Sequence, residues 1–484
     1  DPRVLPLSRA AALEAALAEV GASLELVDEN LVDAVWEDQP SLPEDPVVPQ
    51  PTSFAGESVA SKLRRIRRAM KERGAEALVL TTLDAVAWTF NIRGSDVDFN
   101  PVVIAYGLIT PKDASLFVKT SKVGKDVRAH LGRRVRVRRY TSVESELARL
   151  GRKGAAVWVD AGTASRWVVD RLEGARLITE PTCVEVMKSV KNEVEVKGMR
   201  AAHLRDGVAM VRFLRWLEEE VPTGRVTELS AAAELERLRR KGRHFQGLSF
   251  NTISGYAEHG AIIHYAVDEA SNVTLRSRGV YLVDSGGQYS DGTTDITRTW
   301  LLGRRATRRQ RETYTRVLKG HIALARARFP EGVRGMRLDT LARLPLWEVG
   351  LDYGHGTGHG VGAYLNVHEG PVSISPTRCT GFPLQEGNVL SNEPGYYEPG
   401  GFGIRIENLV AVQPDPELSR DDAKWLRFET LTCCPLDTRL LEPRLLDENE
   451  RRWVNDYHRW VKQKLGGKLG EKDRRWLQRA CRRI

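Results

Sequence analysis

The chain has 484 residues, of which 41% are hydrophobic and 28% are charged. This balance is typical of soluble globular proteins and excludes disordered, collagen-like and disulfide-dense chains, and the length predicts two or three domains. The 73 lysines and arginines exceed the 64 acidic residues and give a formal net charge of +9.

A basic chain is a candidate for binding nucleic acid or an anionic membrane. Here the basic residues are dispersed over separate segments at 62–68, 133–139, 304–309 and 474–483. These segments lack the repeated interleaving of aromatic side chains that a nucleic-acid stacking platform requires. No stretch of about 18 apolar residues is present to span a membrane. We therefore interpret the segments as solvated faces and expect neither nucleic acid nor a membrane as a partner.

The cysteines and the N-terminus predict the cellular compartment. Five cysteines, at positions 183, 379, 433, 434 and 481, form an odd and scattered set without Cys-x-x-Cys spacing. Such a set fits reduced thiols in a cytoplasmic protein. The N-terminus begins Asp1-Pro2-Arg3 and has no basic region followed by an apolar core, so we expect no signal peptide.

Residues 1–50 predict one helix and a linker. Residues 8–23 are rich in alanine and spaced leucines, which indicates a helix that stops at Gly21. Five prolines between residues 40 and 51 exclude a helix or a central strand and mark a domain boundary.

Residues 51–190 alternate between helical and strand patterns. We expect helices at Ser58–Arg73, after Leu83 and at Ala164–Leu172, and strands at 77–80, 102–105, 115–118, 156–159 and 176–178. This order predicts an α/β domain with a mixed sheet. The usual dinucleotide, P-loop and serine-hydrolase motifs are absent from the chain.

Residues 191–440 form the next predicted domain. Two long helices, Glu193–Val221 and Thr227–Lys241, come first, and strands punctuated by glycine dominate from there to about residue 440. Residues 441–484 predict a charged helical extension that carries several aromatic side chains.

Seven of the ten histidines lie between residues 244 and 368, which directs attention to this third of the chain. An apolar strand there runs into Asp284, a glycine-rich reversal follows, and a threonine-rich strand carries Asp295. A hairpin would place these two carboxylates side by side with Cβ atoms about 5 Å apart. Such carboxylates repel each other unless a cation or a shared proton lies between them. The alternative is a polar hairpin tip that faces water.

Three further segments carry acids or histidines among glycines. In His355–Gly362 the sequence HGTGHGVG contains too much glycine for a zinc-binding helix, so we expect a loop that aims its histidines at a ligand. His368 follows nine residues after His359. Glu393 and Glu407 lie in the last two segments, and a lone glutamate on a strand is usually solvated.

Taken together, two aspartates, one or two histidines and two glutamates match a site for two metal ions. Carboxylate oxygens with one imidazole suit Mn²⁺ better than a thiolate-rich zinc site would. Two divalent ions about 3.5–4 Å apart can hold a water molecule between them, lower its pKa and prepare it to attack a carbonyl, as in known aminopeptidases.

Several long motifs make the sequence resemble a known family. They are NTIS at 251–254, GAIIHY at 260–265, DSGGQYSDGTTDITRT at 284–299, HGTGHGVG at 355–362, LNVHEGP at 365–371, NEPGYY at 392–397 and GIRIEN at 403–408. The stretch 83–96 matches as well. With these residues the chain resembles the Xaa-Pro aminopeptidases (aminopeptidase P), in the pita-bread metallopeptidase family that includes prolidase, methionine aminopeptidase and creatinase. The longer, cytosolic branch of eukaryotic type is the most similar.

The resemblance implies roles for ten residues. Five would bind two Mn²⁺ ions, with Co²⁺ or Zn²⁺ as alternatives: Asp284, Asp295, His359, Glu393 and Glu407. Asp295 and Glu407 would bridge the ions, and Glu393 would also act as general base. His264 would steady the scissile carbonyl, and His368 would contact the peptide and the departing proline nitrogen. The remaining three would shape the proline pocket: His355, Tyr397 and Arg405.

The same resemblance implies an α/β (α+β) fold, with a creatinase-like domain at 51–190 and a pita-bread catalytic domain at 191–440. Residues 1–50 would then be the linker and the remnant of a further N-terminal domain. The implied function is release of the N-terminal residue from peptides with proline second, by attack of a metal-bridging hydroxide. A homodimer is expected, with peptides as partners.

Two rival functions remain open. A prolidase that cleaves only Xaa-Pro dipeptides would use the same metal ligands, and an inactive pita-bread scaffold would bind without catalysis. All five implied ligands are present, which disfavours the scaffold. The chain departs from the family at Tyr256-Ala257-Glu258-His259, which replaces a Thr-Gly-Pro-Asn-like turn. We interpret His259 as a solvated loop histidine, and a sixth ligand is the alternative.

Overall fold

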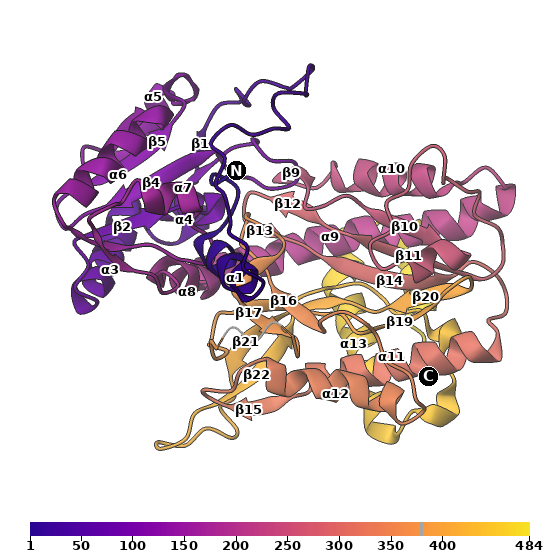
Figure 1. Cartoon of the computed structure of the whole chain (residues 1–484). Helices are drawn as coiled ribbons and strands as arrows, with labels where there is room; N and C mark the ends of the chain where they lie inside the picture. The colour runs from indigo at the N-terminus through magenta and orange to yellow at the C-terminus, as the bar shows by residue number, and fades with distance from the viewer. Residues whose placement is uncertain (378–380) are drawn as a thin grey trace. The chain divides into compact units, whose positions relative to one another are not determined.

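The computed structural model describes residues 1–377 and 381–484. The chain divides into two units, residues 1–188 and residues 189–484 (Figure 1). Cys183, Cys433, Cys434 and Cys481 are free thiols, and Cys379 lies outside the described residues. Within the described ranges, no helix combines the length and the apolar character that crossing a membrane requires.

A six-stranded mixed sheet forms the centre of the first unit. Its strands follow the order β6 (Val135–Arg139), β5 (Ala114–Val118), β4 (Ala105–Ile109), β2 (Ala77–Leu80), β7 (Ala156–Trp158) and β8 (Arg176–Ile178). Strand β4 runs antiparallel to β2 and β5, and the other neighbouring pairs are parallel. Strands β2 and β5 are buried throughout, as expected for apolar strands with both faces covered. The predicted α/β class with a mixed sheet is confirmed.

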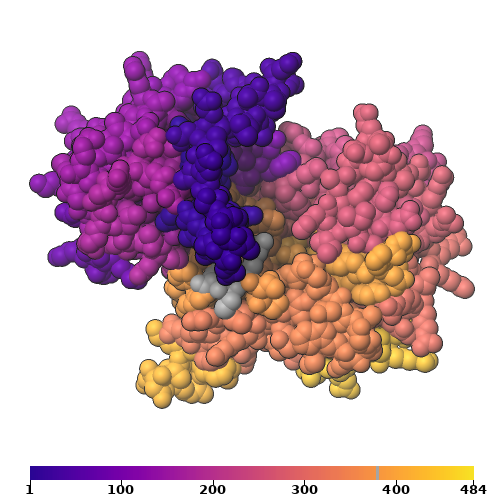
Figure 2. Space-filling model, viewed as in Figure 1, coloured from indigo at the N-terminus to yellow at the C-terminus, as the bar shows by residue number. Residues whose placement is uncertain are grey.

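Helices pack around this sheet, and a short pair of strands lies beside it. The helices are α1 (Leu7–Glu19), α2 (Thr52–Ala55), α3 (Val59–Glu72), α4 (Leu83–Phe90), α5 (Lys125–Leu131), α6 (Val143–Arg152), α7 (Arg166–Asp170) and α8 (Cys183–Ser189); β1 (Val48–Pro49) pairs with β3 (Ile92–Arg93). Helix α3 begins where predicted, because the Ser58 hydroxyl accepts a hydrogen bond from the Ser61 amide. Helix α1, indigo in Figure 2, lies on the surface of this unit and is tied to it by the bond from the Leu7 amide to the Ala164 carbonyl.

The sequence misplaced one strand of this sheet and missed another. The strand expected at 102–105 begins only at Ala105, and the buried Val102 and Val103 precede it without belonging to a strand. Strand β6 was interpreted as a solvated arginine segment. It pairs with β5 at the edge of the sheet, where Arg136 and Arg139 are exposed while Val135 is buried.

The second unit contains several small sheets and one large one. Their strands are β9 (Phe245–Leu248), β10 (Ile253–Tyr256), β11 (Val280–Ser285), β12 (Gly287–Tyr289), β13 (Gly292–Thr293), β14 (Ile296–Leu301), β15 (Arg328–Pro330), β16 (Gly358–Gly360), β17 (Glu369–Ile374), β18 (Val389–Asn392), β19 (Gly395–Glu398), β20 (Phe402–Arg405), β21 (Asn408–Pro414) and β22 (Trp425–Thr430). One sheet has the order β10-β11-β14, and the six-stranded sheet has the order β15-β22-β21-β18-β16-β17.

Helices cover the sheets of the second unit from two sides. They are α9 (Glu193–Glu220), α10 (Glu228–Arg239), α11 (Arg308–Ala325), α12 (Met336–Trp347), α13 (Glu448–Leu465) and α14 (Glu471–Ala480). Helices α9 and α10 pack together beside β10 and β13, whereas α11 and α12 pack together beside β17 and β18 (Figure 1). Strands dominate between residues 242 and 440 as expected, but the sequence analysis did not predict the helices α11 and α12 among them. Helix α11 has a strong start signal, a capping box of Thr307 and Gln310, but its arginine-rich first turns suggested a surface segment.

His458 on α13 is a buried histidine that the fold keeps neutral. Its side chain is in the core, and its Nε2 accepts a hydrogen bond from the Leu436 amide at 3.1 Å. Burial, followed by the positive charge of Arg298, lowers the pKa of His458 to about 4. The folded chain therefore favours the neutral imidazole. The stability that neutral His458 contributes is fully present above pH 6.5, and it is lost as the pH falls toward 4 because the unfolded chain then binds the proton more readily.

We therefore expect His458→Gln to flatten the dependence of stability on pH. Glutamine keeps an acceptor for the Leu436 amide but does not titrate. The free energy of unfolding of the unchanged protein should fall more steeply than that of the variant between pH 6.5 and 4, by up to about 1.4 kcal/mol per pH unit. Urea unfolding at a series of pH values measures this difference. Parallel curves for the two proteins would contradict the assignment.

Candidate metal centre

A cavity of about 560 Å³ in the second unit collects nearly all the predicted site residues. Nine of the ten line it: His264, Asp284, Asp295, His355, His359, His368, Glu393, Arg405 and Glu407. The tenth, Tyr397, lies behind this wall, where its hydroxyl contacts His355 and Arg405. The predicted residues thus meet in one place although they are up to 143 positions apart in the chain.

The two aspartates reach the cavity by a different route from the one predicted. Asp284 lies near the end of β11, but its partner across the sheet is Thr297 on β14, and Asp295 precedes β14. The chain between them forms β12 and β13, and β12 also pairs with β9. The simple hairpin with directly opposed aspartates was therefore wrong, although both carboxylates line the same cavity.

The glycine-rich segment around His359 is partly a strand. Its centre forms β16, which lies between β17 and β18, so the expectation of a loop holds only for the part around His355. A Cβ atom on Gly358 would come within 2.1 Å of the Ser391 carbonyl oxygen, and one on Gly360 within 2.2 Å of the Glu369 carbonyl oxygen. These glycines therefore permit close approach of neighbouring strands, and His359 points from a rigid element.

His359 directs its Nε2 atom at carboxylates. Its Nδ1 donates a hydrogen bond to the Gly360 carbonyl at 2.9 Å, which leaves Nε2 as the ring nitrogen available to a metal ion. This Nε2 lies 3.5 Å from Asp295 Oδ2 and 3.5 Å from Glu393 Oε1. Ligand atoms of Asp295, His359 and Glu407 all lie within 4.8 Å of one another. Acceptors that face one another in this way require a cation or a proton between them.

The protonation of the carboxylates reflects the same crowding. Burial, followed by the negative charges of Asp284 and Glu393, raises the pKa of Asp295 well above its usual value. Burial and the charge of Asp295 do the same to the pKa of Glu407, and removal from water raises the pKa of Glu393. Asp284 Oδ1 is buried and has no hydrogen-bond partner within residues 1–377 and 381–484. A divalent cation fits this donor set, because it would relieve the repulsion and occupy the unpartnered oxygen.

A chain of hydrogen bonds connects the acids to a second wall of the cavity. Arg405 forms an ion pair with Asp284 Oδ2 at 2.7 Å and donates to the Tyr397 hydroxyl at 2.7 Å. The Tyr397 hydroxyl then donates to His355 Nε2 at 2.9 Å, while His355 Nδ1 donates to the Gly356 carbonyl. Burial, followed by the charge of Arg405, lowers the pKa of His355 to about 4. His355 is therefore neutral near pH 7.

The other histidines occupy different positions. His264 is exposed and lines the cavity, and the ring of His368 packs perpendicular to that of His359 with centroids 4.3 Å apart. His259 does not line the cavity. Its Nδ1 lies 3.0 Å from a carboxylate oxygen of the buried Glu228, so it is neither a solvated loop histidine nor placed as a sixth ligand.

Two hydroxyl residues of the site escaped the sequence analysis. The Thr297 hydroxyl donates to Glu407 Oε2 at 2.9 Å and accepts from Arg405 Nε at 3.2 Å. The Ser391 hydroxyl accepts from the His359 amide at 2.9 Å and donates to Glu393 Oε1 at 3.2 Å. Their nearness to Asp295 and Glu393 in the motifs was the available signal, but serine and threonine on strands are too common to identify without coordinates.

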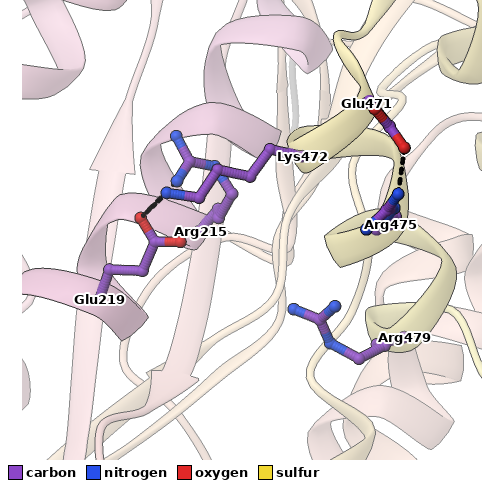
Figure 3. Close-up of a pocket in the computed structure, with 6 residues that line it drawn as sticks. All are labelled: Arg215, Glu219, Glu471, Lys472, Arg475 and Arg479. Carbon is purple, nitrogen blue, oxygen red and sulfur yellow. Dashed lines mark hydrogen bonds and ion pairs between the residues drawn. The ribbon is translucent and has the colours of Figure 1, made fainter.

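A second cavity, of about 320 Å³, lies between α9 and α14 and is lined by charged side chains (Figure 3). Its acids pair with neighbouring cations, Glu219 with Arg215 and Lys472, and Glu471 with Arg475. No histidine or group of carboxylates in its lining resembles the metal-binding set. The chemistry of this unit is therefore assigned to the cavity around His359.

Comparison with known families agrees with this division of the chain. Residues 38–195 match the creatinase/prolidase N-terminal domain, residues 197–414 match metallopeptidase family M24, and residues 424–484 match the C-terminal region of that peptidase family. These matches confirm the predicted combination of a creatinase-like domain and a pita-bread catalytic domain.

Curated relatives and solved structures extend the comparison. A probable Xaa-Pro aminopeptidase P from Paracoccidioides brasiliensis is 42% identical over all of this chain and 82% of its own length. One from Neosartorya fischeri is 41% identical over 99% of this chain and 75% of its own length.

A crystal structure of X-prolyl aminopeptidase from Caenorhabditis elegans, described as a cytosolic enzyme with a di-nuclear active site, has a TM-score of 0.96 and 35% identity. It matches all of this chain and 80% of that one. A Xaa-Pro dipeptidase from Bacillus anthracis, which matches 78% of this chain and 99% of its own, has a TM-score of 0.62 at 22% identity and shows the shared fold alone. Together these findings confirm the predicted resemblance: the chain belongs to the Xaa-Pro aminopeptidase P family, within metallopeptidase family M24.

Proposed function

We propose that this chain is a metal-dependent aminopeptidase that releases the N-terminal residue from peptides with proline at the second position. The observation that carries the proposal is the cavity in which His359 Nε2 faces the carboxylates of Asp295 and Glu393. The names of the relatives and of the C. elegans structure support the substrate class.

Five residues would hold two divalent ions: Asp284, Asp295, His359, Glu393 and Glu407. Carboxylate oxygens predominate among these donors, which favours Mn²⁺, with Co²⁺ or Zn²⁺ as alternatives. When bound, such ions lower the pKa of a water molecule and polarise a carbonyl group. Asp295 and Glu407 would serve both ions, which agrees with the proximity of their oxygen atoms to each other and to His359.

The remaining residues would bind the peptide and move protons. Glu393 would accept a proton from the attacking water at its carboxylate, where Ser391 already donates a hydrogen bond. His264 would donate to the scissile carbonyl oxygen as the carbon becomes tetrahedral. His368 would contact the peptide and the departing proline nitrogen.

A shaped pocket is needed because proline has a ring and its preceding amide has no N–H to hydrogen-bond. His355, Tyr397 and Arg405 would form and orient this pocket. The hydrogen bonds among them hold the neutral His355 ring in one orientation, which is the rigidity that selection by shape requires.

We further propose that the protein acts in the cytoplasm as a homodimer on peptides, without nucleic acid or membrane partners. The description of the C. elegans neighbour as cytosolic supports the location. The proposed division into residues 1–50, 51–190, 191–440 and 441–484 keeps the catalytic residues within the third segment.

Peptide specificity tests the proposal directly. With Mn²⁺ present, Arg-Pro-Pro and longer Xaa-Pro peptides should lose their first residue, as followed by mass spectrometry. Replacing the second-position proline with alanine should lower kcat/KM. The loss should correspond to at least ~1–3 kcal/mol of transition-state stabilisation, as for an apolar misfit, and to more if buried contacts are also lost. Acetylation of the N-terminal amine should stop cleavage, because the free amine is expected to dock near the metal ions.

Two results of this assay would contradict the proposed function and indicate a different one. Cleavage of Xaa-Pro dipeptides alone would identify a prolidase. Removal of methionine from Met-Ala peptides at a comparable rate would point to the methionine aminopeptidase branch.

Substitutions should separate metal ligands from peptide-binding groups. His359→Ala removes a ligand and should lower both bound metal and turnover. His264→Ala should retain the metal and lose mainly kcat, because its proposed contact strengthens in the transition state. Elemental analysis and steady-state kinetics on the same preparations measure both effects. A His264→Ala protein that has lost its metal would show that His264 was assigned the wrong role.

The loss of stability caused by breaking the buried pair of Arg405 and Asp284 should depend on added metal. Arg405→Gln leaves Asp284 beside three other carboxylates without its cation, so the metal-free protein should lose about 3–5 kcal/mol of stability. Excess Mn²⁺ should restore part of this loss by supplying positive charge at the same place.

The matched control for Arg405→Gln is Lys122→Gln, which breaks the buried pair of Lys122 with Asp96 in the first unit. Its stability should show no restoration by Mn²⁺ beyond the increase seen with the unchanged protein. Equal recovery in both variants, measured by urea unfolding, would contradict a metal site beside Asp284.

A further inference from the structure

Two buried asparagines flank the glutamates of the proposed metal site. Asn392 directly precedes Glu393, and Asn408 directly follows Glu407. The asparagines face each other as register partners on β18 and β21, and neither is exposed to solvent. The position of this pair of asparagines therefore determines where the backbones of Glu393 and Glu407 lie relative to the cavity.

His321 on α11 bonds to both asparagines. Its Nδ1 donates to the Asn392 carbonyl at 3.1 Å, and the Asn392 side-chain amide donates to the His321 carbonyl at 2.9 Å. His321 Nε2 lies 3.2 Å from Asn408 Nδ2 and accepts from it. The neutral ring thus supplies one donor and one acceptor, and burial, followed by the charge of Arg298, lowers its pKa to about 3.

Arg298 fixes the orientation of the Asn408 amide from the other side. Its Nη2 donates to Asn408 Oδ1 at 2.8 Å, which leaves the Asn408 NH₂ group to face His321. Its Nη1 donates to the Glu407 carbonyl at 2.7 Å. Arg298 is fully buried and therefore holds both the backbone carbonyl of Glu407 and the side chain of the next residue, Asn408.

Helix α13 of the C-terminal region completes the arrangement. The Tyr457 hydroxyl accepts from Arg298 Nη2 at 3.1 Å and donates to the Cys434 carbonyl at 2.8 Å. The Tyr457 ring stacks on Trp453 with centroids 5.3 Å apart and planes 5° apart. Trp453 in turn packs edge-on against His321 with centroids 5.9 Å apart. The contacts therefore form a closed ring. It runs from Tyr457 through Arg298, Asn408, His321 and Trp453 and returns to Tyr457.

We propose that His321 and Tyr457 are positioning residues for the two glutamate ligands, so that α13 is a working part of the metal centre. This inference rests on the proposed function. A metal site requires its donor atoms within about 0.2 Å of their proper places, and partners behind the ligands commonly change metal affinity by about 10- to 100-fold. The ring around Asn408 provides such support from a region far along the chain.

Tyr457→Phe tests the contribution of α13. The variant keeps the stacked ring and removes only the hydroxyl that Arg298 uses. We expect its dissociation constant for Mn²⁺, measured by calorimetry on the metal-free protein, to rise about 10- to 100-fold.

The control for this variant is Tyr314→Phe on α11. Tyr314 is also fully buried, and its hydroxyl makes none of the hydrogen bonds that form the ring. Its affinity for Mn²⁺ should stay unchanged. Equal Mn²⁺ affinities for the Tyr457→Phe, Tyr314→Phe and unchanged proteins would overturn the inference.

His321 offers a test by rescue. Glutamine can supply the same donor and acceptor as the neutral ring, whereas leucine of similar bulk supplies neither. Mn²⁺ affinity should therefore be lost in His321→Leu and largely restored in His321→Gln. Equal loss in both variants, with metal-free unfolding midpoints that show both are folded, would mean that the ring packs without positioning the ligands.

The unchanged protein separates this inference from the proposed function. If it binds no divalent cation, the proposed metal centre itself fails, and the inference fails with it. If it binds Mn²⁺ and cleaves Xaa-Pro peptides while Tyr457→Phe and His321→Leu bind Mn²⁺ equally well, only the positioning roles are wrong.

Discussion

Four carboxylates gathered in one cavity repel one another, and the second unit must hold them together against that repulsion. Asp284, Asp295 and Glu407 are buried, and Glu393 is only partly exposed. Removing a charged carboxylate from water costs several kcal/mol unless a partner compensates. Among the residues that the structure describes, Arg405 is the one arginine or lysine that forms an ion pair with any of the four acids. The pair of divalent cations that we propose would offset the remaining negative charge of the four carboxylates.

The architecture serves this constraint by bringing rigid strand ends to one point. The four acids lie at or directly beside the ends of β11, β14, β18 and β21. His359 comes from β16, where glycines let neighbouring strands approach closely. Hydroxyl groups of Thr297 and Ser391 tie individual carboxylates to that framework. Because strands hold donor atoms more precisely than loops do, the site can be shaped before a metal binds.

The sequence predicted the site better than it predicted the fold around it. The acids and His359 came from motifs in which an acid or histidine interrupts a glycine-rich or apolar strand, and such local chemistry is visible in one dimension. His264, Tyr397 and Arg405 were named only through the family resemblance. The register of β11 and β14 was not visible, because it depends on β12 pairing with the distant β9. Helix α11 was missed because its arginines masked an apolar face, and the link from Tyr457 to Asn408 joins residues 49 positions apart.

The number of metal ions held by each chain tests the central claim most directly. Metal-free protein would be equilibrated with Mn²⁺, dialysed and subjected to elemental analysis together with a protein determination. Five ligands of which two serve both ions predict two Mn²⁺ per chain, and His359→Ala should retain fewer. A stoichiometry of zero, or full Xaa-Pro cleavage by protein that has been shown to contain no metal, would contradict the account.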